Sequence, residues 1–269
     1  MNAGLSATAR LAVRGIAHVW RRVWLILALF VAWWAVTALG WVSSVKLPPP
    51  SDVWEALGRG FSDLDLWNAI VATLVRLAEG WAMGAGIAVI LGILTAASPF
   101  LEDGIRPVIA GLQGVPTIAF LPLAILWFGP SGAAVLAITA FGTFKPMMLA
   151  TYGAVRQVPP TLRQAARSMG ASGLFYQRTL IFPAAIPGLV VGLRLSWSFA
   201  WRSLMAAELI VGGIDGLGQV LERGRELNSI DLVIAVILEI AVIGILFEQL
   251  VFARFERWVQ RRWGLAQAT

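Results

Sequence analysis

Six stretches of this chain are each long and apolar enough to cross a lipid bilayer, and they constrain the fold more than any other feature. A helix needs about 20 mainly apolar residues to cross a hydrocarbon core of about 30 Å. Backbone groups in lipid must pair within their own segment, so such spans are helical. The sequence predicts an all-α polytopic membrane protein with spans at 23–42, 80–97 with a more polar lead-in from residue 67, 107–128, 133–152, 188–211 and 232–252.

The composition agrees with this class. Only 13% of residues are charged and the mean hydropathy is +0.77, whereas soluble domains average about 25% charged residues. The absence of cysteine excludes a disulfide framework and a thiolate metal site. The net charge of +6 does not indicate nucleic-acid binding, because the basic residues lie beside the apolar spans. The first span is longer than the 7–15-residue core of a signal peptide, so it is predicted to be an uncleaved anchor.

The basic residues also predict the orientation, because arginine and lysine accumulate in cytoplasmic loops. With the N-terminus inside, the outer segments hold only Lys46, Arg59, Arg223 and Arg225 and are otherwise acidic, with Asp52, Glu55, Asp63, Asp65, Asp215, Glu222, Glu226 and Asp231. The inner segments hold Arg10, Arg14, Arg21, Arg22, Arg106, Arg156, Arg163, Arg167, Arg178, Arg254, Arg257, Arg261 and Arg262. Both termini are therefore expected in the cytoplasm of a bacterial cell.

Polar residues inside the spans are functional candidates, because a charge at the bilayer centre costs at least about 2.5–3.5 kcal/mol. At 100° per residue, Arg194 and Glu208 fall within about 40° of one another on the fifth span. Two interpretations stay open: a translocation pathway for an anionic solute, or buried structural ion pairs such as Glu239 with Arg202. The candidate pathway residues are Arg194, Ser198, Trp201, Arg202 and Glu208 in the fifth span and Glu239 in the sixth.

Other features of the spans indicate packing. Arg76 and Glu79 are predicted to form a local ion pair, and Lys145 is predicted to snorkel to the interface. Pro116 and Pro122 predict a kink in the third span, with carbonyls that a neighbour must satisfy. A stripe of small residues in the second span predicts close approach of another helix and comprises Gly80, Gly84, Ala88, Gly92 and Ala96.

The chain carries no pattern typical of an enzyme. Neither Lys46 nor Lys145 follows a glycine, so there is no G-x-x-x-x-G-K-[ST] phosphate loop. His18 is the single histidine and has no metal-ligand partners in the sequence. No nucleophile–base pair stands out. We therefore expect no catalytic site, no metal and no cofactor bound by this chain.

Residues 162–183, LRQAARSMGASGLFYQRTLIFP, form a basic segment that reads as helix, turn and helix. Pro159 and Pro160 mark its entry, Thr161 is predicted to cap the first helix, and Gly170 is predicted to end it in a left-handed conformation. A second short helix is predicted over 172–180, before Pro183 and Pro187 interrupt the path back into the membrane. Its apolar contacts are assigned to Leu174, Phe175, Leu180 and Ile181, and its polar positions to Tyr176, Gln177 and Arg178. One alternative is an amphipathic hairpin resting on the bilayer.

This segment resembles the EAA loop of ABC importer permeases, whose pattern is E-A-A, three residues, Gly, nine residues, Ile, any residue, Leu-Pro. The matching positions are Gln164-Ala165-Ala166, Gly170 and Leu180-Ile181-Phe182-Pro183. Gln164 replaces the family Glu, Leu180 stands in the Ile slot and Phe182 in the Leu slot. The resemblance implies coupling helices that fit a groove on a cytoplasmic ATPase, with the coupling residues Arg163, Gln164, Ala165, Ala166, Arg167, Gly170, Leu180 and Pro183.

The resemblance extends over nearly the whole chain. Segments such as KLPPPSDVW, GVPTIAFLPLAILWFG and AWRSLMAAELIVGGIDGLGQ are similar to the nitrate/sulfonate/taurine subfamily of type I ABC importer permeases. Membership implies a homodimeric permease for a small anion, with two ATPase subunits that hold ATP and Mg²⁺ and an external binding protein docked near the acidic outer loops. The expected organisation is an N-terminal segment with the first span over 1–66, a permease core over 67–252 containing the coupling loop 156–187, and a basic tail over 253–269.

Two other functions remain alternatives. A proton-coupled secondary transporter would use Glu208 and Glu239 as relay groups. A non-transporting membrane scaffold would need Arg202 and Glu208 only for assembly.

Overall fold

A computed structural model describes residues 24–63 and 66–263, and every regular element among them is helical. The basic start with Arg10, Arg14, Arg21 and Arg22, together with His18 and Asp65, lies outside the described residues. After a first helix, Trp24–Ala38, the elements are α2 Pro50–Asp63, α3 Leu66–Ala97, α4 Pro99–Gln113, η1 Thr117–Phe120, α5 Leu121–Phe128, α6 Gly132–Arg156, α7 Pro160–Ser168, α8 Gly173–Tyr176, η2 Gln177–Ile181, α9 Phe182–Ile210, α10 Leu217–Glu226, α11 Ile230–Phe247, η3 Glu248–Phe252 and α12 Ala253–Arg262.

The spans differ in detail from the six predicted windows. Within the described ranges, four helices are long and apolar enough to cross a membrane: Leu66–Ala97, Gly132–Arg156, Gly173–Ile210 and Ile230–Arg262. The third window is instead a broken pair, Pro99–Gln113 and Thr117–Phe128, bent by 103°. In the first window the described helix, Trp24–Ala38, is shorter than a full span.

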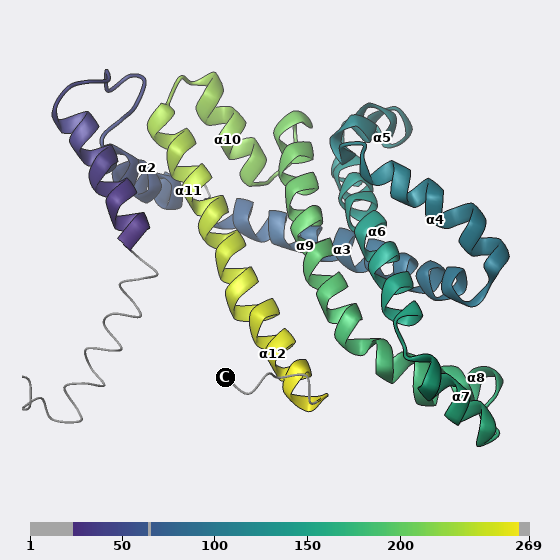
Figure 1. The fold of residues 1–269 in the computed structure, drawn as a ribbon. Coiled ribbons are helices and arrows are strands. Elements are labelled where there is room, and N and C mark those ends of the chain that lie inside the picture. The colour runs from purple at the N-terminus through teal and green to yellow at the C-terminus, as the bar shows by residue number, and fades with distance from the viewer. Residues whose placement is uncertain (1–23, 64–65, 264–269) are drawn as a thin grey trace, which may run out of the picture.

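The small-residue stripe of α3 packs against α6, as predicted. Gly80, Gly84 and Gly92 are buried at this crossing, where side-chain bulk is excluded. A Cβ atom on Gly84 would lie 2.3 Å from the carbonyl oxygen of Ala140, which no real contact tolerates. The lack of side chains therefore brings the two backbones together. α6 packs in turn against α9, so α3, α6 and α9 form the centre of the bundle (Figure 1).

Lys145 stabilises the break in the third span through hydrogen bonds. The prediction that its side chain extends to the membrane interface is therefore wrong. Pro116 has no amide hydrogen, so it cannot donate to the carbonyl of Leu112 four residues earlier. The ammonium group of Lys145 donates to the carbonyls of Leu112 and Val115, at 3.2 and 3.0 Å. It also faces the rings of Phe120 and Phe141. Only 2% of Lys145 is exposed, so its side chain is buried inside the bundle and does not extend to the interface.

The two ends of the bundle carry different elements. α7, α8 and α12 lie at the lower end in Figure 1, and α5 and α10 lie at the upper end. Two π turns, η2 and η3, lead into α9 and α12.

The chain from α8 to Ile210 is one continuous helix, which corrects the predicted interruption at Pro183 and Pro187. Pro183 lies in the first turn of α9 and follows the π turn Gln177–Ile181, and Pro187 is accommodated inside α9. Wide turns and prolines change the local hydrogen bonding of a helix without ending it. The second short helix predicted over 172–180 is therefore the beginning of the fifth span.

Candidate functional site

The predicted helix–turn–helix is present as α7, a tight turn and α8. Gly170 has φ +83°, the left-handed conformation predicted for it, which only glycine adopts without strain. Thr161 does not cap α7, because the helix begins one residue earlier, after Pro159, and has no side-chain cap. α7 is thus bounded by the proline entry and the glycine exit.

Arg163 ties α7 to the end of α6. Its guanidinium donates to the carbonyl of Val158 at 3.1 Å and to the carbonyl of Val155. Val155 lies in the last turn of α6 and Val158 follows the end of that helix, so both bonds hold α7 against this end. Ala166 is buried on the same helix, while Gln164 and Ala165 are exposed. Of the predicted coupling residues, Arg163 and Ala166 therefore hold the projection in place, and Gln164 and Ala165 face outward.

Large apolar side chains project from the turn and from α8. Met169, Leu174 and Phe175 are 80%, 81% and 65% exposed. Tyr176, which is assigned to the polar positions of the second short helix, is buried, with the guanidinium of Arg167 5.7 Å from its ring centroid. We call Met169, Leu174 and Phe175 the tip cluster. Its exposure is typical of a surface that another protein covers.

The C-terminal half of the loop motif is anchored to the bundle. Ile181 is buried, Leu180 is partly buried and packs against the central core, and the carbonyl of Pro183 accepts a 3.0 Å hydrogen bond from the indole of Trp263 at the end of α12. The predicted apolar positions therefore divide, with Leu180 and Ile181 inside and Leu174 and Phe175 outside.

The pathway candidates on the fifth span do not share one site. Arg194, at the lower part of α9, forms ion pairs with Glu248 and with Glu256, the latter at 2.8 Å. The hydroxyl of Ser198 donates weakly to the carbonyl of Arg194, at 3.4 Å. The indole of Trp201 lies against Gly244 of α11. The contacts of Arg194 and Trp201 join α9 to the sixth span, whereas the Ser198 bond stays within α9.

Glu208 is fully buried near the upper end of α9, in a network that sequence reasoning did not find. Its carboxylate pairs with Arg76 and accepts hydrogen bonds from the hydroxyl of Thr73 at 2.8 Å and from the amide of Gly218 at 3.2 Å. The Thr73 hydroxyl also accepts a 2.9 Å bond from the amide of Leu217. The network fixes the start of α10 onto α3 and α9.

Two predicted pairs are therefore wrong. Arg76 pairs with Glu208 and not with its neighbour Glu79, because burial of the Glu208 carboxylate requires a counter-charge. Glu239 and Arg202 form no ion pair within the described residues. Glu239 is half-buried, and its Oε2 has no hydrogen-bond partner among the described residues.

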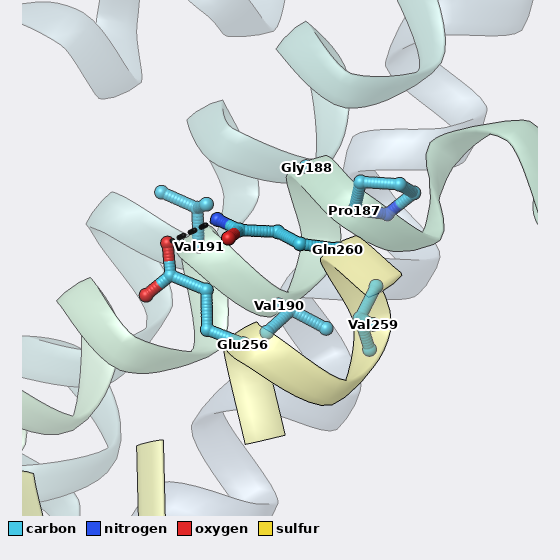
Figure 2. Close-up of a pocket in the computed structure, with 7 residues that line it drawn as sticks. All are labelled: Pro187, Gly188, Val190, Val191, Glu256, Val259 and Gln260. Atoms are coloured by element: carbon cyan, nitrogen blue, oxygen red, sulfur yellow. Dashed lines mark hydrogen bonds between the residues drawn. The ribbon is translucent and has the colours of Figure 1, made fainter. Parts of the chain in front are cut away.

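Two grooves border α9. The lower one, of about 520 Å³, lies between α9 and α12 and is lined by Pro187, Gly188, Val190, Val191, Glu256, Val259 and Gln260. Figure 2 shows the amide of Gln260 directed at the Glu256 carboxylate, a hydrogen bond of 3.2 Å. The upper groove, of about 500 Å³, is lined by Leu209, Ile210, Leu221, Glu222, Arg225 and Val233.

Comparison with known proteins agrees with this architecture. The family described as binding-protein-dependent transport system inner membrane component matches residues 88–262. The taurine transport system permease protein TauC of Escherichia coli is 32% identical over 82% of each chain. The aliphatic sulfonates permease SsuC of Bacillus subtilis is 32% identical over 86% of this chain and 84% of its own. The nitrate import permease NrtB of Synechocystis is 29% identical over 84% of each.

The fold matches a solved transporter as well. An inward-facing structure of the MetNI methionine ABC transporter aligns with a TM-score of 0.63 and 20% identity, covering 72% of this chain and 95% of that one. Together with the family match and the apolar spans, this settles the class. The chain belongs to the binding-protein-dependent transport system inner membrane component family, the multi-pass inner-membrane permease subunits of ABC importers.

Proposed function

We propose that this chain forms the transmembrane pathway of an importer for a small oxyanion of the sulfonate, taurine, nitrate or bicarbonate kind. The support for the solute class is similarity, since relatives carrying those names align over more than four-fifths of this chain. ATP is hydrolysed by a separate ABC ATPase subunit, and an external binding protein delivers the solute.

The single observation that carries the coupling role is the tip cluster. Met169, Leu174 and Phe175 are exposed on a projection that is rigidly anchored by Arg163 and Ile181. A rigid apolar projection costs little ordering entropy on docking, which suits a groove on a partner protein. We propose that the ABC ATPase covers this cluster, and that Gln164 and Ala165 contact it beside the cluster.

The assembly follows from the same assignment. Two copies of this chain carry two ATPase subunits at the end of the bundle with α7 and α8. That end lies in the cytoplasm with both termini, because arginine is concentrated in the segments that share it. The opposite end, with α10 and α2, receives the binding protein.

The test is copurification and ATP-driven uptake with Leu174→Glu and Phe175→Glu. Each is expected to abolish association with the ABC ATPase subunit while the permease still inserts, because a charge is placed in an apolar contact. For the copurification readout, Trp54→Glu is the matched control, since Trp54 is an equally exposed apolar residue on α2 at the other end. Association that survives both substitutions would refute the assignment of the tip cluster.

Uptake that continues without ATP would favour the proton-coupled alternative. The structure argues against Glu208 as a proton relay in such a transporter, because its carboxylate is already bound by Arg76, Thr73 and the Gly218 amide.

A further inference from the structure

One face of α9 is exposed along most of its length and is apolar except at its middle. Val191, Leu195, Phe199, Arg202 and Ile210 are all exposed. At 100° per residue they lie within about 100° of one another, so they form a single stripe. We call it the Arg202 face. Arg202 lies within this stripe as its only charged member.

Among the described residues, Arg202 has neither a carboxylate nor a carbonyl of another helix bound to it, unlike the other cations that lie away from the ends of the spans. Its Nε donates to the carbonyl of Ser198 on its own helix at 3.0 Å, and its guanidinium carbon lies 4.5 Å from the ring centroid of Phe199. No other partner is present among the described residues. Its terminal amino groups are thus held in place by the stack and remain available to bind a ligand.

The three other cations that lie away from the ends of these spans are bound within the protein. Arg76 and Arg194 are paired with carboxylates, and Lys145 is bound to two carbonyls. A guanidinium that faces hydrocarbon at the centre of a span costs at least about 2.5–3.5 kcal/mol. The energetically favoured surroundings of the Arg202 face are therefore water or protein.

The two grooves lie at the two ends of this face. Val191 lines the lower groove and Ile210 lines the upper one. At about 1.5 Å of rise per residue, Arg202 lies roughly 16 Å from Val191 and roughly 12 Å from Ile210. The Arg202 face therefore connects the two grooves, with its single positive charge between them. The lower groove is lined by the Glu256 carboxylate, which would repel an anion. Arg202 is therefore a better contact for an anion than the lower groove is.

We propose that Arg202 is the intramembrane contact for the transported oxyanion, a point that rests on the proposed function because α9 must line the pathway. A guanidinium matches two oxygens of a sulfonate, nitrate or carboxylate at once. Phe199 holds the guanidinium plane so that the terminal amino groups face the pathway. A single cation on an otherwise apolar face attracts an anion and still releases it, as conduction requires.

The absence of cysteine makes a chemical-rescue experiment direct, because Arg202→Cys introduces the only thiol of this chain. The full importer, with ATPase and binding protein, is reconstituted in liposomes. Ethanesulfonate, taurine, nitrate and bicarbonate are first tried on the wild type to select the probe. In Arg202→Cys, uptake is expected to fall roughly 10- to 100-fold, the loss expected for a charge-assisted hydrogen bond. ATP hydrolysis stimulated by the binding protein should persist.

Modification of the thiol then shows whether uptake depends on the positive charge at position 202 or only on the size of the side chain there. A positively charged methanethiosulfonate reagent should restore uptake, and a negatively charged one should not. Arg202→Lys should retain more uptake than Arg202→Gln. The matched control is Ile237→Cys, an exposed apolar position on α11 outside the Arg202 face, which should transport normally before and after modification.

The outcomes are distinct. A wild-type complex that imports none of the four probes with ATP would overturn the proposed function. A working wild type with an equally active Arg202→Gln, or rescue by both reagents alike, would overturn only this inference. Failure of Arg202→Cys to copurify with the ATPase would also overturn it, by making Arg202 a structural residue.

Discussion

The pair between Arg76 and Glu208 is the buried interaction whose loss should cost this protein most. The Glu208 carboxylate is 0% exposed, and Arg76 is its only counter-charge in the part of the chain that the structure describes. Arg76→Met keeps most of the side-chain volume and leaves the carboxylate to be stabilised by Thr73 and the Gly218 amide alone. Removing one partner of a buried ion pair costs about 3–5 kcal/mol. We expect a loss of that size in the free energy of unfolding.

The companion variant Glu208→Gln removes the charge from the other side. Combined with Arg76→Met, it leaves no uncompensated charge in the interior. The double variant should therefore be more stable than the sum of the two single losses predicts. The coupling free energy should fall in the range of about 0.5–3 kcal/mol seen for residues in contact.

The assay is thermal unfolding in detergent, followed by tryptophan fluorescence. At roughly 2 °C per kcal/mol for a chain of this size, Arg76→Met should lower the Tm by about 6–10 °C. Arg225→Met is the control, because it breaks the solvent-exposed pair with Glu222 and should leave the Tm unchanged within error. The reasoning is refuted if the two variants behave alike, or if the effects of Arg76→Met and Glu208→Gln simply add.

Three further predictions concern packing and docking. Gly84→Leu should prevent the close approach of α3 and α6 and reduce the yield of folded protein in detergent, whereas Gly86→Leu, with open space around its Cβ, should not. Lys145→Met should lower the Tm by several degrees, because each carbonyl left unsatisfied in the interior costs about 1–3 kcal/mol; an unchanged Tm would show that the break needs no brace. Gln164→Glu should leave the Tm unchanged, since Gln164 is exposed, and should make association with the ATPase more sensitive to salt.

Much of the fold could be predicted from local signals. The small-residue stripe of α3 predicts close helix packing, because glycines at four-residue spacing leave room for another helix backbone. Gly170 ends α7 as predicted, since its position after a short run of helix formers leaves few other roles. Such features depend on residues near one another in the sequence.

The partners of the buried charges could not be predicted in this way. Arg76 lies three residues from Glu79, yet it pairs with Glu208, far away in the sequence, because only the buried carboxylate requires it. Arg194 likewise finds Glu248 and Glu256 on the last helix. The helical angle predicts that Arg194 and Glu208 lie on one face of the fifth span, but it carries no information about which helix lies opposite each of them.

The continuity of Gly173–Ile210 has a mechanical consequence. The exposed Leu174 and Phe175 stand at one end of this 38-residue helix, and Arg202 stands on the same rod beyond its middle. No hinge longer than a π turn separates them. A partner that tilts α8 therefore also moves the Arg202 guanidinium, because both belong to one stiff helix. Displacement at the docking end thus reaches the anion contact without any further moving part.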